Sequence, residues 1–145
     1  MKPLILSWQL WALLSAGFAA LTAVLAKIGV GAIHPDVATF YRTIVILVLL
    51  GAILAISGEW QNPATIPGRA QLFLILSGLA TGASWLCYFR ALKLGDAARV
   101  APIDKMSVVL VALFGVFFLG EQLSLPNWLG VGLIACGAVL VAMRG

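Results

Sequence analysis

Residues 99–121 read RVAPIDKMSVVLVALFGVFFLGE, with two adjacent charges, Asp104 and Lys105, at the start of an apolar run that continues to Gly120. The rest of the chain has the same character: 63% of its 145 residues are hydrophobic, 10% are charged, and the mean hydropathy is +1.11. Soluble domains are only about half apolar. Because so few polar side chains cannot cover a soluble surface, the composition predicts a protein of the lipid bilayer.

Five apolar runs are visible, at residues 8–30, 37–57, 71–93, 100–120 and 127–143. Each contains about 17 to 23 residues, and a helix rising about 1.5 Å per residue then crosses a hydrocarbon core of about 30 Å. Lipid offers no hydrogen-bond partners to the backbone, so such spans should be α-helices. The sequence therefore predicts an all-α integral membrane protein, with residues 1–145 forming one domain of five transmembrane helices.

The charges distribute unevenly if successive spans alternate in direction. Two Lys or Arg residues and two acids fall on one side: Lys2, Glu59, Arg69 and Glu121. Seven Lys or Arg residues and three acids fall on the other: Lys27, Asp36, Arg42, Arg90, Lys93, Asp96, Arg99, Asp104, Lys105 and Arg144. Because Lys and Arg concentrate on the cytoplasmic side of membrane proteins, we expect the C-terminus in the cytoplasm.

The spans differ in side-chain size. Residues 43–56, TIVILVLLGAILAI, are bulky and aliphatic, which is typical of a lipid-facing helix. The first, third and fifth spans contain small residues, including Gly78 and Gly82 in the third and Gly130, Gly132 and Gly137 in the fifth. Small residues let helix backbones approach within a membrane, so these three helices are expected to pack closely.

The third span carries a stripe of polar and aromatic side chains. Steps of three and four residues place its members on one helix face: Ser77, Thr81, Ser84, Trp85 and Tyr88. Either the stripe is a packing face whose hydroxyls bond to their own helix, or it lines a cavity that a substrate enters. Ser15 and Thr22 of the first span are candidates to face the same space.

Four segments resemble the EamA family of the drug/metabolite transporter superfamily: AVLAKIG at 23–29, ATFYRTIVI at 38–46, CYFRALKLGDAARVAPID at 87–104 and GEQLSLPNWLGVGLIACGAVLV at 120–141. Their order and spacing fit one five-helix repeat of that family across essentially the whole chain. Most members carry two such repeats. The resemblance implies transport of small metabolites or drugs across the cytoplasmic membrane, without a bound cofactor.

Two departures from the superfamily limit what the resemblance implies. Small multidrug-resistance proteins use a membrane-embedded Glu in their first helix to exchange protons for cationic drugs, but residues 8–30 contain no acid. EamA proteins also often have small or hydroxyl residues where this chain has Asp104 and Lys105. That pair therefore marks a position at which substrate choice can differ.

Asp104 and Lys105 have two interpretations. With Pro102 in the first turn of the fourth helix, Asp104 would meet the positive end of the helix dipole, and Lys105 would extend to the interface. Alternatively, Asp104 faces the helix bundle. Helix neighbours point about 100° apart and should not pair with each other, so its partner would be Arg90, Arg42 or Lys27. Such a site would be a gating ion pair or would attract anionic or zwitterionic solutes.

The leading functional hypothesis is a transporter in which two five-helix repeats of opposite orientation enclose the path. The second repeat would come from a homodimer or from an oppositely oriented paralogue. The alternative is a non-transporting membrane subunit that packs through its small-residue faces. The candidate pathway residues are Ser15, Arg42, Thr81, Trp85, Tyr88, Arg90, Asp104 and Lys105.

Other classes of function lack the residues they require. The sequence has no paired catalytic carboxylates and no phosphate-binding loop, so we do not expect an enzyme. His34 reads as a loop residue before Pro35 with no second ligand nearby, and Cys87 and Cys136 read as packing residues within spans. The expected partners are the bilayer and a small-molecule substrate, with no metal, cofactor or nucleic acid.

Overall fold

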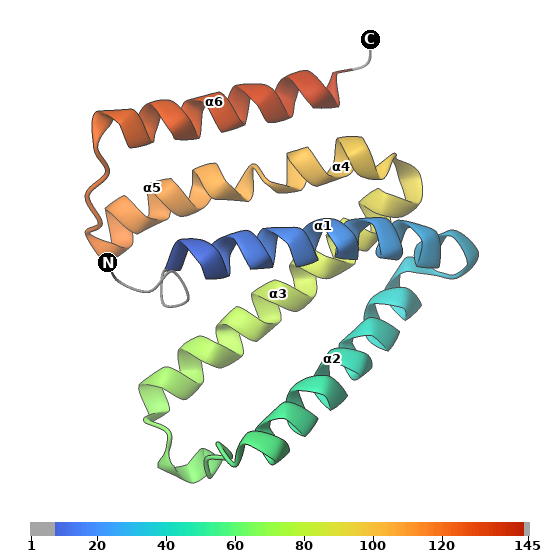
Figure 1. The fold of residues 1–145 in the computed structure, drawn as a ribbon, viewed down its shortest axis with the longest axis vertical. Helices are drawn as coiled ribbons and strands as arrows, with labels where there is room; N and C mark the ends of the chain where they lie inside the picture. Colours follow the sequence, from blue (N-terminus) through green and yellow to red (C-terminus); the bar gives the residue numbers. More distant parts are fainter. Residues whose placement is uncertain (1–7, 144–145) are drawn as a thin grey trace. The chain divides into compact units, whose positions relative to one another are not determined.

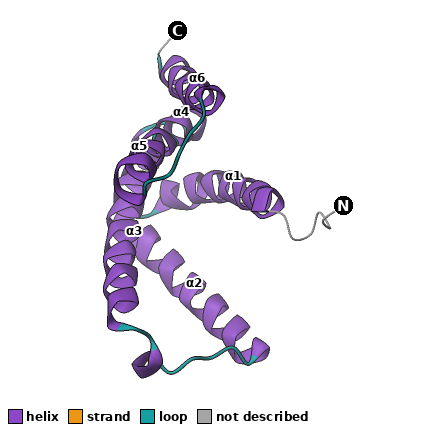
Figure 2. Cartoon of the chain, turned by 90° about the vertical axis from the view of Figure 1, so that its left-hand side faces the viewer, coloured by secondary structure: helices purple, strands orange, loops and turns teal. Residues whose placement is uncertain are grey.

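The computed structural model describes residues 8–143, so Lys2 and Arg144 of the charge distribution lie outside the described residues. Within this range every regular element is helical (Figure 2). Five helical spans are long and apolar enough to cross a membrane: Trp8–Ala32, Pro35–Ser57, Gly68–Leu94, Ala97–Leu119 and Leu125–Ala142. The predicted fold class, an all-α membrane protein with five spans, is confirmed.

The start and end of the second span follow from local sequence. α2 (Pro35–Ser57) begins at a proline, whose missing N–H is harmless in a first turn. His34 was predicted to be a loop residue; it also caps the helix, because its Nδ1 accepts a hydrogen bond of 3.3 Å from the Asp36 N–H. The helix ends at Gly58, which adopts φ 68° in the left-handed region that glycine tolerates.

The fourth span is two helices, α4 (Ala97–Asp104) and α5 (Ser107–Leu119), and this corrects one prediction. Pro102 lies inside α4, and Asp104 is the last residue of that helix, so Asp104 does not meet the positive end of a helix dipole. Without a proline N–H, the carbonyl four residues earlier has no helical donor. At the interruption the Met106 N–H donates to the Ile103 carbonyl and the Val108 N–H to Lys105, in tighter three-residue turns.

The chain comprises two units that are described separately, and residues 26–93 form one of them. This unit contains the end of α1 (Trp8–Ala32), then α2, the short 3₁₀ helix η2 (Pro63–Thr65) and α3 (Gly68–Leu94). Its core lies where α1 and α3 end and α2 begins. There Val30, Phe89 and Leu92 expose only 1%, 2% and 0% of their surface, and Ala26, Ala38 and Thr39 are also buried.

The other unit, residues 1–25 and 94–145, contains the start of α1, then α4, α5 and α6 (Leu125–Ala142). A short connection returns α6 antiparallel along α4 and α5 (Figure 1), and Ala138 is buried in this packing. The close packing expected among the first, third and fifth spans stays a prediction, but three glycines of α6 are not at this contact. A Cβ built on Gly130, Gly132 or Gly137 meets no atom within 4 Å, because α6 packs against its sequence neighbours through other residues.

Two glycines of α2 provide a matched test of the helix end. We expect Gly58→Ala to destabilise the chain by about 1–2 kcal/mol, because an L-residue in the left-handed region is strained. Neither Gly58 nor Gly51 has a neighbouring atom within 4 Å of a built Cβ, so steric overlap does not contribute. Gly51→Ala, inside the helix, should be neutral or stabilising. Thermal unfolding in detergent measures both; equal destabilisation would contradict this account of the helix end.

Candidate functional site

Two lysines exchange contacts between the ends of α1 and α3. Lys93 of α3 donates from Nζ to the carbonyls of Val30 (2.9 Å), Gly31 (2.7 Å) and Ile33 (3.4 Å). In return, Lys27 of α1 donates from Nζ to the carbonyl of Leu92 at 2.7 Å. The last carbonyls of a helix have no intrahelical donor, and lipid supplies none. Each lysine therefore satisfies carbonyls at the C-terminus of the other helix.

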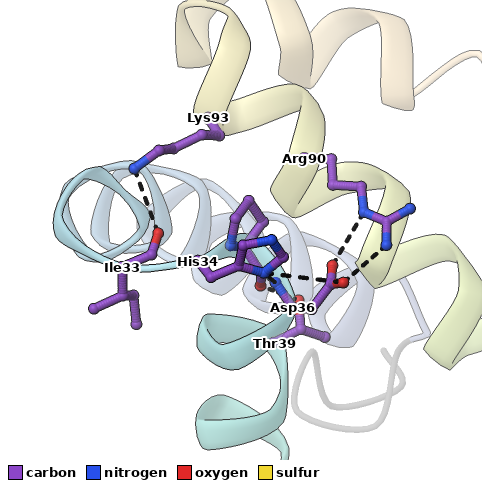
Figure 3. Close-up of polar contacts among 7 residues, drawn as sticks. Ile33, His34, Asp36, Thr39, Arg90 and Lys93 are labelled. Carbon is purple, nitrogen blue, oxygen red and sulfur yellow. Dashed lines mark hydrogen bonds and ion pairs between the residues drawn. The ribbon is translucent and has the colours of Figure 1, made fainter.

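Arg90, one turn before Lys93, connects the same end of α3 to the start of α2 (Figure 3). Its Nε donates to Asp36 Oδ1 at 3.0 Å, and its Nη2 donates to Asp36 Oδ2 at 2.8 Å. This is the bidentate fork in which guanidinium and carboxylate match most closely. Asp36 also lies in the first turn of α2, where negative charge is favourable. Arg90, a predicted pathway residue, is thus held by an acid that the sequence analysis assigned no role.

Arg42 extends from α2 over two aromatic rings of α3. Its guanidinium carbon lies 3.9 Å from the centroid of the Trp85 ring and 5.7 Å from that of Phe89, so both contacts are within cation–π range. Trp85 and Phe89 are four residues apart and share one helix face. The structure therefore brings together two predicted pathway residues, Arg42 and Trp85, from different helices.

Two further predicted residues of α3, Thr81 and Tyr88, contact their own helix. Thr81 is exposed, and its hydroxyl donates to the Ser77 carbonyl at 2.9 Å, as the packing interpretation of the stripe expects. Tyr88 is half-buried, with its ring edge-on to Phe89 at 6.4 Å between centroids. Ser15 is exposed on the part of α1 that belongs to the other unit.

Asp104 and Lys105 contact each other, which corrects the expectation that these neighbours cannot pair. Lys105 Nζ lies 3.4 Å from Asp104 Oδ2, and both side chains are substantially exposed. The expectation assumed a continuous helix, whereas Lys105 lies in the interruption between α4 and α5. The proposed partners of Asp104 have other contacts: Arg90 with Asp36, Arg42 with Trp85, and Lys27 with Leu92.

The junction formed by the ends of α1 and α3 and the start of α2 is strongly cationic. It carries four positive side chains, Lys27, Arg42, Arg90 and Lys93, and one carboxylate, Asp36. Ionisable side chains within membrane spans are rare and usually have charged or carbonyl partners or a function. Among residues 8–143, no three His, Cys, Asp or Glu side chains come together as metal ligands would.

Sequence reasoning missed how these residues pair. The sequence prediction counted three of them, Asp36, Lys27 and Lys93, only as charges, apart from naming Lys27 as a possible partner of Asp104. A sequence signal for their meeting was nevertheless present. Asp36 directly follows the helix-starting Pro35, and Arg90 and Lys93 are one turn apart at the end of a span. Together these positions indicate charged groups that meet at one end of three helices.

The fold and the junction define a class of protein: a multi-pass membrane protein with charged side chains inside its spans. Comparison with known proteins identifies the family. Residues 6–143 match the model of the EamA-like transporter family, and the chain belongs to that family. The resemblance in the sequence is therefore confirmed. No solved structure matches the chain.

Three relatives illustrate the range of similarity. A Sinorhizobium protein described as "Uncharacterized transporter in cobO 3'region" is 69% identical over 94% of this chain and 97% of its own length. The probable 4-amino-4-deoxy-L-arabinose-phosphoundecaprenol flippase subunit ArnE of Aeromonas salmonicida is 33% identical over 66% of this chain and 94% of its own. Human solute carrier family 35 member G1 is 31% identical over 84% of this chain, which corresponds to 32% of the human protein.

The exchange of lysine contacts predicts unequal effects of two Lys→Met substitutions, each of which keeps the length of the side chain but removes its donors. Lys93→Met leaves carbonyls at the end of α1 without their donor and should cost about 1 kcal/mol or more. Lys105→Met removes a single 3.4 Å contact with the adjacent Asp104 and no carbonyl contact, so it should have little effect. Thermal unfolding in the same detergent compares the two variants. A loss for Lys105→Met as large as that for Lys93→Met would contradict the assigned role of Lys93.

Proposed function

We propose that this chain is a transporter of small metabolites or drugs in the cytoplasmic membrane and that two five-helix repeats enclose its path. The observation that supports this most directly is the contact between Arg42 and Trp85, a half-buried cation and an aromatic side chain inside membrane spans. Ionisable side chains within spans usually mark substrate or ion pathways. Family membership supports transport over catalysis, and we propose that the chain is not an enzyme.

The proposed pathway follows the face of α3 that contacts α2. Thr81, Trp85 and Tyr88 lie at intervals of three and four residues on α3, and Arg42 reaches Trp85 from α2. Near the end of α3, Arg90 pairs with Asp36 of α2, and this ion pair would close the pathway at that end. Ser15, Asp104 and Lys105, in the other unit, remain candidate pathway residues by sequence alone.

The second repeat would come from a homodimer or from an oppositely oriented paralogue, with the C-terminus of this chain in the cytoplasm. Many large apolar side chains of the five spans are exposed and need a covering of lipid or protein. Gly78 and Gly82 on α3 also have open space around a built Cβ, which leaves room for another helix. ArnE, a relative of this chain, is itself named as a flippase subunit.

The name of ArnE also supports the alternative, a membrane subunit that does not itself transport. In that case the polar face of α3 would pack against a partner or remain in lipid. Water access to this face separates the two functions, because a solute pathway must admit water and a packed face excludes it.

The test uses single cysteines at positions 81, 85 and 88, in a background where Cys87 and Cys136 are replaced by alanine. A membrane-impermeant methanethiosulfonate reagent, applied to both sides of membrane vesicles, should label all three positions. Leu79→Cys is the matched control, because residue 79 lies on nearly the opposite face of α3; it should stay unlabelled. Labelling of position 79 alone, or of none of the four, would contradict the proposed pathway.

A further inference from the structure

The cations of the α1–α2–α3 junction differ in whether they have acceptors. Lys27 and Lys93 donate to backbone carbonyls, and Arg90 donates to both oxygens of Asp36. Arg42 lies over the rings of Trp85 and Phe89, and Tyr88 is close enough to interact with its charge. Within residues 26–93, no carboxylate and no carbonyl accepts a hydrogen bond from its guanidinium.

The contact with Trp85 orients Arg42 for an incoming ligand. At 3.9 Å from the ring centroid, the guanidinium is held by cation–π attraction. That contact involves the ring face of Trp85 and uses none of the five N–H groups of the arginine. A planar cation with free donors matches the oxygens of a carboxylate or phosphate group bidentately.

The position of Arg42 requires a partner more than an arginine at the membrane surface would. It is the eighth residue of α2, so it lies roughly 10 Å along the helix from Pro35, and it is half-buried. The one acid of the junction, Asp36, is already engaged by Arg90. The unit therefore contains a fixed, oriented positive charge whose hydrogen-bonding capacity is unused.

We propose that Arg42, held against Trp85, is a binding site for an oxyanion, namely the carboxylate or phosphate group of a small solute or of a lipid headgroup. The oxyanion accepts hydrogen bonds from the guanidinium, while the half-buried Trp85 contacts the apolar part of the same ligand. The inference names the chemical class of ligand for the pathway proposed above. That Arg42 binds an oxyanion does not depend on the proposed function; that the bound ligand is transported does.

The test measures binding, so it does not depend on transport. The chain is placed in phosphatidylcholine nanodiscs, and its unfolding temperature is followed as inorganic phosphate or benzoate replaces chloride at constant ionic strength. Wild-type protein should be stabilised in a saturable way by at least one of the two anions. Arg42→Gln should weaken this binding by at least about tenfold. Arg42→Lys, which keeps the charge without the fork, should also weaken it and guards against misfolding of the Gln variant.

Arg69→Gln is the matched control, because Arg69 also lies over an aromatic ring, that of Phe73 at 5.9 Å, at the start of α3. It should bind as the wild type does. In nanodiscs containing phosphatidylglycerol, stabilisation that depends on Arg42 without any response to soluble anions would identify a lipid headgroup as the source of the oxyanion. The proposal is wrong if neither the soluble anions nor phosphatidylglycerol stabilise the wild type more than Arg42→Gln, or if Arg69→Gln loses as much binding. If the cysteines on the α3 face stay unlabelled while Arg42 still binds the anion, the proposed pathway is wrong but the anion site is not.

Discussion

Arg90 and Lys93 lie one turn apart at the end of α3, and the ends of two other helices depend on their contacts. Lys93 donates to carbonyls on the last turn of α1, and Arg90 holds the carboxylate that begins α2. His34 and Pro35 lie between these two contacts, so the turn from α1 to α2 is held on both sides. The last carbonyls of a helix have no donor within the helix, and a carbonyl left unpaired away from water is costly, so these contacts make the junction a defined structure.

The junction also fixes the position of Arg42 against the aromatic side chains of α3. Because α2 starts at a fixed position relative to α3, the eighth residue of α2 meets the ring of Trp85, and Phe89 lies on the same face. The other charged side chains of the junction already have partners: Lys27 and Lys93 donate to helix-end carbonyls, and Arg90 pairs with Asp36. The remaining cation is the one that faces aromatic side chains, which is why recognition of an anionic group is assigned to it.

The sequence was sufficient for the class of fold, because hydropathy and length alone determine which segments can cross a bilayer. The tally of charges also grouped Lys27, Asp36, Arg42, Arg90 and Lys93 on one side, and these residues meet in the structure. The sequence could not show which of these charges pair, because Asp36 and Arg90 are 54 positions apart and no local pattern links them. The break in the fourth span was missed because Pro102 was expected in the first turn of a helix. The helix instead begins at Ala97 and ends at Asp104, so Asp104 was misplaced.

The central claim is that Arg90 and Asp36 act as one unit that holds the start of α2 to α3. A double-mutant cycle tests it most directly, with Asp36→Asn, Arg90→Gln and the combined variant compared by thermal unfolding in one detergent. If the two residues form a unit, each single substitution destabilises the chain, and the double variant loses clearly less than the two single losses added together. Strictly additive losses, or two silent single variants, would contradict the account.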